Sequence, residues 1–367
     1  MRNPRFWLGL ALSAVCLYFA FRGIDFIALS AALTRANYLY LIPAVAIVVG
    51  TLILRAYRWG MLFYPDQPPR LGKLFSALSI GYLISTILPA RLGDVVRAAL
   101  VGEGKGPKFA QALSTVVVER LLDMSSIIVM LLILLPFVEL SPVLERSAIT
   151  IAVTLALAFV VLIVASWQRG RAVALLRGLL LRVPRLNADV WAQRFAGLLD
   201  GLSVLRAPVQ LVKVELVSLV IWLVGGTLYN YLALRAFNLD GNFPYAWSAL
   251  AAAAFVQVVV ALGAAVPSSP GYVGVYHAGV ILALAAFGVP QAEALAFALV
   301  SHAVNFGTLL IIGAIFLWRE GLSLGQLIGS RETPESSATP AATGSQAAPG
   351  TPVDLPPSIM PSDSTRG

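Results

Sequence analysis

Helix breakers and charges follow a long uncharged stretch in the first third of this chain. Residues 74–90 carry no charge, and the polar break that follows them holds Pro89, Arg91, Gly93, Asp94 and Arg97. A charge at the centre of a membrane costs about 2.5 to 3.5 kcal/mol on insertion scales, and non-helical backbone persists at that depth only where protein or water covers it. The stretch therefore predicts a polar site lined by protein inside a membrane.

The composition supports a membrane protein. Hydrophobic residues make up 59% of the chain and charged residues 12%, whereas about a quarter of the residues of a water-soluble domain are charged. The net charge of +8 does not indicate nucleic acid, because the basic residues lie in short loops beside apolar runs, where anionic headgroups explain them. Cys16 is the single cysteine, so neither a disulfide nor a metal cluster is expected. No metal site and no cofactor are expected.

The apolar runs predict an all-α polytopic membrane helix bundle. About 20 residues cross the hydrocarbon core, which gives about eight transmembrane helices plus re-entrant segments. The predicted spans are 6–21, 38–54, 116–138, 148–167, 216–237, 247–265, 272–287 and 292–318.

Basic loops predict the topology of the bundle. Segments 55–73, 91–120 and 169–213 are all basic, and the positive-inside rule places them together in the cytoplasm. We therefore expect residues 74–89 to be a re-entrant hairpin that does not cross, and both termini to be cytoplasmic in an inner-membrane protein.

Two domains are expected from these patterns. Residues 1–326 form the membrane domain, which includes a basic connector at 168–213. Within it, apolar residues recur at helical spacing along 190–205, as in an interfacial amphipathic helix. Residues 327–367 are rich in Pro, Ser and Thr, which predicts a disordered tail.

A second break resembles the first. Pro-x-x-x-Gly-x-Val begins at Pro89 and again at Pro267, so that Gly93 pairs with Gly271, and Pro270 lies within the second copy. After a shift of four residues, Glu119, Arg120 and Asp123 pair with Ser301, His302 and Asn305. Transporters with inverted repeats hold substrate between such broken segments. The alternative is chance, because Pro and Gly are frequent in membrane helices.

Several polar residues have both a functional and a structural interpretation. Glu119, Arg120 and Asp123 can share one helix face, or they can end a helix at the headgroups. His277 and His302 can serve a proton relay or contact a phosphate, or each can make an interhelical hydrogen bond.

Two other motifs have alternatives of the same kind. The Arg-x-Tyr-Arg-Trp motif at 55–59 suits an interface anchor or a headgroup site. A hydrolase with a Ser268 or Ser269 nucleophile is disfavoured, because the Gly-x-Ser-x-Gly elbow is absent.

Together these motifs resemble the transmembrane region of lysylphosphatidylglycerol synthases, a flippase-like family. The likeness rests on Arg-x-Tyr-Arg-Trp, on Leu-Pro-Ala-Arg-Leu-Gly-Asp-Val-Val-Arg-Ala at 88–98, on Glu-Arg-Leu-Leu-Asp at 119–123 and on Pro-Ser-Ser-Pro-Gly-Tyr-Val-Gly-Val-Tyr-His at 267–277. The resemblance implies a membrane bundle that moves an aminoacyl-phospholipid or a polyprenyl-linked glycan between leaflets. Full-length synthases carry a soluble transferase domain that we do not find here, so synthase activity is not expected.

The hypothesis is therefore a flippase or transporter for an anionic or modified lipid. The alternatives are a membrane-embedded lipid-modifying enzyme and the membrane partner of a separate transferase. The expected substrate-binding residues are Arg58, Arg91, Arg97, Ser268, Ser269 and His277. The expected coupling network is Asp94, Glu119, Arg120, Asp123, His302 and Asn305. The expected hairpin breaks are Pro89, Gly93, Pro267, Pro270 and Gly271.

Overall fold

The structure is a computed structural model, and it describes residues 4–88, 92–102, 109–138, 142–182, 187–201, 206–243, 245–265, 268–323 and 325. Pro89, Arg91, Pro267 and the predicted tail at 327–367 lie outside the described residues. The described part of the chain is helical and contains no strand, which confirms the all-α prediction.

The first half of the chain contains nine helices and two short 3₁₀ turns within the described residues. They are α1 (Pro4–Phe21), α2 (Phe26–Arg35), η1 (Tyr38–Tyr40), α3 (Leu41–Met61), α4 (Leu71–Ile87), α5 (Leu92–Val101), α6 (Phe109–Leu134), η2 (Leu135–Phe137), α7 (Pro142–Trp167), α8 (Arg169–Leu180) and α9 (Ala188–Gly201).

The second half begins with a long helical span in which a π-helical turn separates two α-helices. It comprises α10 (Pro208–Leu219), the π-helical turn η4 (Val220–Gly226), α11 (Thr227–Ala236), η5 (Leu239–Asn242), α12 (Ala246–Ala265), η6 (Pro270–Tyr272), α13 (Val275–Ala285) and α14 (Gln291–Arg319).

Four helical segments among the described residues are long and apolar enough to cross a membrane, or six if two bent helix pairs each count as one span. The four are residues 38–61, 208–236, 246–264 and 291–319, and the bent pairs are α1 with α2 and α7 with α8. At its 26 residues α6 is also long enough to cross, at about 39 Å, but Glu119, Arg120 and Asp123 lie in its middle. This chain is therefore a multi-pass membrane protein.

The prediction of a full span at 272–287 is wrong. Helix α13 has 11 residues, and at 1.5 Å per residue it reaches about 17 Å, roughly half of the hydrocarbon core. It begins after a turn in which Gly271 and Gly274 have φ values of 67° and 90°. The positive φ angles end the helical path, so α12 and α13 form a hairpin, as α4 and α5 do.

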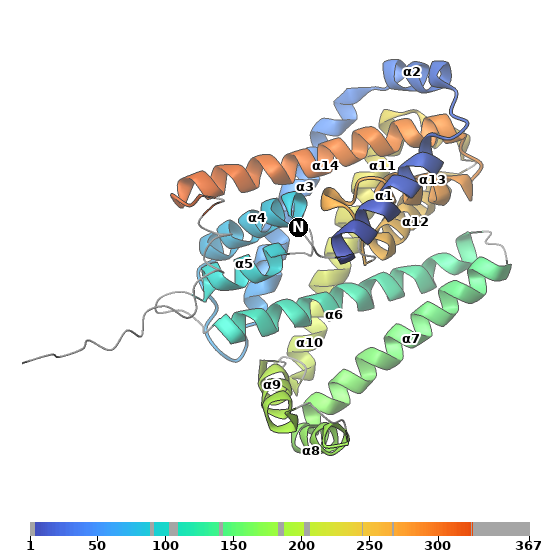
Figure 1. The fold of residues 1–367 in the computed structure, drawn as a ribbon. Helices are drawn as coiled ribbons and strands as arrows, with labels where there is room; N and C mark the ends of the chain where they lie inside the picture. The colour runs from blue at the N-terminus through green and yellow to red at the C-terminus, as the bar shows by residue number, and fades with distance from the viewer. Residues whose placement is uncertain are drawn as a thin grey trace, which may run out of the picture. The chain divides into compact units, whose positions relative to one another are not determined.

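The two hairpins belong to two copies of one helix arrangement. Helices α3, α4, α5 and α6 pack against one another in sequence, and α11, α12, α13 and α14 do the same. Across the copies α4 packs on α14, α12 packs on α6, and α3 packs on α11. Figure 1 shows α6 and α14 running in opposite directions, and likewise α3 and the α10–α11 span. The matching order of helices and their opposite directions support the inverted repeat that the motif spacing suggests.

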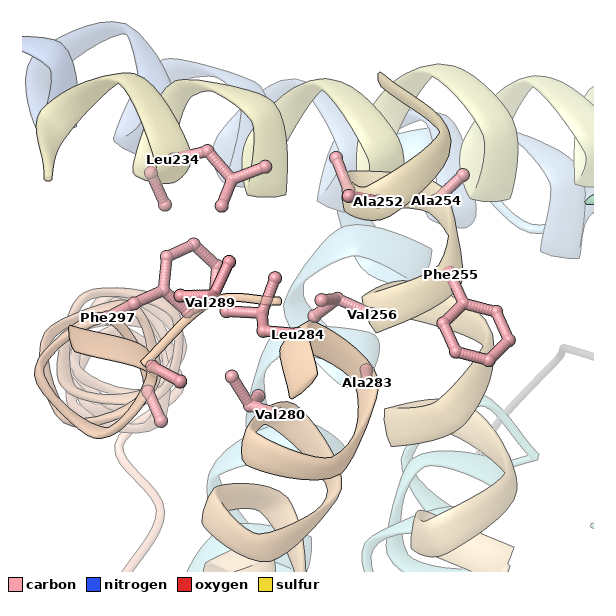
Figure 2. Packing of buried hydrophobic residues seen from close by; sticks show 14 of the residues in the cluster. Leu234, Ala252, Ala254, Phe255, Val256, Val280, Ala283, Leu284, Val289 and Phe297 are labelled. Atoms are coloured by element: carbon pink, nitrogen blue, oxygen red, sulfur yellow. The ribbon is translucent and has the colours of Figure 1, made fainter. Parts of the chain in front are cut away.

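Small residues allow the second hairpin to pack closely. Figure 2 shows Val256 of α12 beside Leu284 of α13, with Ala252 and Ala283 on the same two helices, and all four side chains are buried. In a membrane there is little hydrophobic drive between helices, so close contact between small side chains provides much of the attraction.

Helices α8 and α9 form the basic connector between the two repeats. They pack on each other, and α9 also contacts α6. Leu199 of α9 is buried, while Leu175 and Leu179 of α8 are exposed. The exposed leucines beside Arg171 and Arg177 suit a helix that lies in the membrane interface.

The orientation of the bundle can be tested by cysteine labelling. Cys16 is the single cysteine, so Cys16→Ser provides a background without cysteine. In that background we expect Leu175→Cys to react with an impermeant maleimide only from the cytoplasm and Leu39→Cys only from the opposite side. Both positions are exposed, and the positive-inside rule predicts that the basic connector is cytoplasmic. Labelling of both from the same side would contradict this topology.

Candidate functional site

Six charged side chains from α3, α5 and α6 form a closed ring of alternating charge. Each neighbouring pair is joined by a nitrogen–oxygen contact of 2.7 to 3.4 Å. Three guanidinium groups and three carboxylates sum to zero charge, which is the condition under which charges persist away from water. In order around the ring the members are Asp94, Arg97, Glu119, Arg58, Asp123 and Arg120.

One half of the ring is almost completely buried. The side chains of Arg58 and Glu119 are 0% exposed, and Arg97 is 2% exposed. Glu119 lies 3.1 Å from Arg58 Nη2 and accepts a hydrogen bond of 2.8 Å from Arg97. The Arg97 guanidinium also lies over the ring of Trp59, 4.9 Å from its centre. These charges therefore have protein partners and almost no exposed surface.

The other half of the ring faces a cavity. Arg120 donates two hydrogen bonds to Asp94, of 2.7 and 3.2 Å, and one of 3.4 Å to Asp123. Asp94, Arg97, Arg120 and Asp123 line a cavity of about 570 Å³. The ring thus forms a polar part of the cavity wall that presents both charge signs to a ligand.

The long α10–η4–α11 span holds the ring from the side. Ser218 accepts a hydrogen bond of 2.8 Å from Arg58, and the indole nitrogen of Trp222 donates one of 2.9 Å to Asp123. Trp222 lies in the π-helical turn, a feature that often marks functional sites. Gly225 and Gly226 of the same turn line the cavity, and a Cβ at Gly226 would lie 2.5 Å from Gln257.

The cavity walls are mostly apolar, with polar groups at a few places. Both repeats contribute, since Asp123 of α6 and its predicted counterpart Asn305 of α14 line the same cavity. The polar lining residues beyond the ring are Thr51, Arg55, Tyr82, Ser85, Thr86, Tyr229, Asn230, Gln257, Tyr272, Tyr276 and Asn305.

Arg55 supplies a positive charge to the cavity that the ring does not neutralise. It lines the cavity one turn before Arg58 on α3, and its guanidinium lies over the ring of Trp222, 5.3 Å from the centre. Among the described residues it has no carboxylate within 4.0 Å. A planar guanidinium stacked on an indole keeps its donors available for a phosphate or carboxylate.

A close approach of α4 and α5 positions the ring. A Cβ on Gly93 would overlap the carbonyl oxygen of Gly81, and a Cβ on Gly81 would lie 3.1 Å from the Cβ of Arg97. Glycine at both positions therefore brings the start of α5 against α4. This contact places Asp94 and Arg97 beside the Glu119 turn of α6.

The two histidines lie behind the second break. His302 Nε2 lies 2.9 Å from the carbonyl oxygen of Gly271, and His277 Nδ1 accepts a hydrogen bond of 3.3 Å from the Gly274 nitrogen. Their ring centres are 5.0 Å apart. Neither histidine lines the cavity, whereas Tyr276 beside them does. In this structure the histidines bind backbone groups that the break releases from helical pairing.

The serines of the second break lie beside α1. The Ser269 nitrogen donates a hydrogen bond of 2.8 Å to Ser13, and its hydroxyl donates one of 3.0 Å to the carbonyl oxygen of Val273. Ser268 Oγ is buried and has no hydrogen-bond partner within the part of the chain that the structure describes. Neither serine lines the cavity, so the structure does not bring them to the charged ring.

The second break lies close to the end of α4. Gly271 approaches Thr86 at the end of α4, with its Cβ position 3.7 Å from the Thr86 carbonyl oxygen, and η6 packs on α4. Gly93 and Pro270 thus lie on elements that both contact α4. The roles assigned to individual residues remain predictions.

Sequence reasoning missed the contribution of α10 and η4. Ser218 and Trp222 lie four residues apart in a span chosen only for its hydropathy. A polar stripe at helical spacing within an apolar span was the available signal, and it included Glu215, three residues before Ser218.

Comparisons with known proteins agree with these motifs. The family described as the lysylphosphatidylglycerol synthase TM region matches residues 6–313. A UPF0104 membrane protein of Methanothermobacter thermautotrophicus is 25% identical over 295 residues, which cover 78% of this chain and 84% of that protein. The match includes the charged ring, the cavity and both breaks, and the chain therefore belongs to the family of the lysylphosphatidylglycerol synthase transmembrane region.

Proposed function

We propose that this protein moves an anionic lipid between the leaflets of its membrane, with the headgroup entering the cavity between the two repeats. The shape of the cavity supports this function. Its volume of about 570 Å³ is in the range of pockets for small ligands. We expect it to hold the headgroup while the lipid chains follow the apolar wall.

The observation that carries the proposal is Arg55 at the polar end of that cavity. The ring beside it is neutral as a whole, so Arg55 gives the site a net attraction for an anion. A phosphate would pair with the guanidinium group of Arg55. It would also accept a hydrogen bond from Arg120, whose side chain is 32% exposed. An aminoacyl-phospholipid and a polyprenyl-linked glycan both provide such a phosphate.

The inverted arrangement supports transport in particular. Broken helices from both repeats lie beside the cavity, and α4 and α14 join one repeat to the other. In transporters of this kind one repeat rocks against the other around a fixed site, so that the site opens to each side of the membrane in turn. An enzyme would need no such pairing of repeats.

A leaflet-resolved lipid assay tests the proposal. The protein is reconstituted in vesicles with fluorescently labelled phosphatidylglycerol, and dithionite reports how much label has reached the inner leaflet. We expect wild-type protein to speed exchange of the labelled phosphatidylglycerol well above protein-free vesicles, and to act much less on labelled phosphatidylcholine. An acceleration equal for both lipids, or none for phosphatidylglycerol and for a labelled polyprenyl phosphate, would contradict the proposal.

Arg55→Gln is the matched variant for this assay. Removing the charge should reduce phosphatidylglycerol movement by about tenfold or more, because a charge-assisted hydrogen bond contributes about 1.5 to 3 kcal/mol. Folding should be unaffected, since Arg55 is outside the ring. Arg35→Gln is the control, because Arg35 is an exposed arginine at the end of α2. Equal movement by both variants would remove Arg55 from the site.

A further inference from the structure

One carboxyl group next to the charged ring has no cation partner. Glu215 of α10 accepts a hydrogen bond of 3.0 Å from the Ser126 hydroxyl of α6. Its other oxygen, Oε2, is buried and has no hydrogen-bond partner of good geometry among the described residues, although the Ser125 hydroxyl is also nearby. Within the described residues no Lys, Arg or His nitrogen lies within 4.0 Å of this carboxyl group.

Glu215 is connected to the ring through its own helix. Ser218 follows one turn later and binds Arg58, and Trp222 follows four residues after that and binds Asp123. The three side chains therefore lie along one face of the α10–η4 span. Glu215 does not line the cavity, and it lies between the ring and the connector end of α10.

The charged groups near Glu215 either pair with other residues or point elsewhere. From α3 the nearby charge is Arg58, which is shared between Glu119 and Asp123. From α6 it is Asp123, which has the same sign as Glu215. On α10 itself Lys213 is exposed. Among the described residues, no cation therefore lies within 4.0 Å of Glu215 to hold it in its ionised form.

Hydroxyl partners allow either protonation state. A hydroxyl can donate to a carboxylate and can accept from a carboxylic acid, so the Ser126 contact survives when Glu215 gains a proton. The buried Oε2 atom accepts no hydrogen bond of good geometry from the described residues, so it is available to carry that proton. Arginine partners, which only donate, would not permit the exchange.

We propose that Glu215 binds the proton that is coupled to the binding of an anionic lipid headgroup. The step is the uptake of one proton by one carboxylate to give a carboxylic acid. With Glu215 ionised, Arg55 and Glu215 cancel beside the neutral ring. With Glu215 protonated, the group carries one positive charge, which a phosphodiester headgroup would neutralise. Proton and lipid therefore favour each other's binding, and by linkage the effect is reciprocal.

This inference rests on the proposed function, and its test is arranged so that the two can fail separately. Purified protein in detergent is titrated with short-chain phosphatidylglycerol at pH 5.5 and 8.5. We expect binding to be about tenfold tighter at the lower pH, within the usual range of coupling between sites. Glu215→Gln should bind at both pH values with nearly the same affinity, because glutamine cannot titrate. Glu293→Gln, at the start of α14, should keep the wild-type pH dependence.

Reconstituted protein then separates the outcomes. If wild-type protein moves phosphatidylglycerol and a protonophore slows it while leaving Glu215→Gln unchanged, the inference holds. If wild-type protein moves the lipid without regard to the pH gradient, or Glu215→Gln keeps the wild-type pH profile, Glu215 is not the proton site and the transport function survives. If no lipid moves at all, the proposed function fails.

A folding defect in Glu215→Gln would not prevent the test. Proton uptake by wild-type protein can be measured directly in weak buffer when phosphatidylglycerol is added, and up to one proton per protein is expected. Ser126→Ala keeps the carboxyl group but removes its hydroxyl partner, so it should shift the pH at which binding changes. No proton uptake in wild-type protein and no shift in Ser126→Ala would overturn the inference.

Discussion

Replacing Glu119 with glutamine should leave little folded protein in the membrane. Among the described residues, Glu119 is the one carboxylate that joins Arg58 to Arg97 in the enclosed half of the ring. Without it two buried guanidinium groups share too little negative charge. Removing one partner of a buried pair costs about 3 to 5 kcal/mol, which is a large fraction of the stability of most folded proteins. Thermal unfolding followed by size-exclusion chromatography measures the effect.

An exposed ion pair provides the control for this variant. Arg177 lies 2.7 Å from Asp189 in the connector, and both side chains are more than half exposed. Arg177→Gln should change stability by about 1 kcal/mol or less. Restoring the charge balance with Arg97→Met in the Glu119→Gln background should recover part of the loss. A wild-type melting temperature for Glu119→Gln would mean that the ring does not hold the three helices together.

Gly93→Ala is expected to be nearly as damaging, for a different reason. The added methyl group would overlap the carbonyl oxygen of Gly81, which belongs to the backbone of α4. The overlap can be relieved only by moving α5 away. Overpacking of this kind costs about 1 to 3 kcal/mol or more, and the displacement would pull Asp94 and Arg97 out of the ring. We expect lower thermal stability together with loss of lipid movement.

Gly72→Ala separates this steric effect from a general cost of replacing glycine. Gly72 lies on α4, and its Cβ position has no neighbour within 4 Å. Alanine is the better helix former, so Gly72→Ala should be neutral or slightly stabilising. If Gly93→Ala behaves as Gly72→Ala does, the close contact between α4 and α5 is not required.

Local spacing allowed part of the site to be predicted. Glu119, Arg120 and Asp123 are three and four residues apart, and the helix period alone places them side by side. Three charges in an apolar helix also require compensation. The partners could not be named from spacing, because Arg58 and Asp123 are 65 residues apart and Arg58 and Ser218 are 160 apart.

The histidines show where the sequence was ambiguous. A histidine near a helix break can face a substrate, or it can hydrogen-bond to the backbone groups that the break exposes. The same sequence pattern is compatible with both roles. In the structure His302 contacts the Gly271 carbonyl group and His277 the Gly274 nitrogen. The short α13 was mistaken for a full span because hydropathy does not register a positive φ angle at Gly271 or Gly274.

The most direct test of the central claim is to find the lipid in the cavity. Phosphatidylglycerol with a photoactivatable group near its headgroup is added to reconstituted protein, and the adducts are mapped by mass spectrometry. The account predicts adducts on cavity residues such as Tyr82, Trp222 and Tyr276, reduced by Arg55→Gln. Adducts confined to membrane-facing side chains such as Leu157 and Val161 of α7, which are 61% and 64% exposed, would contradict it.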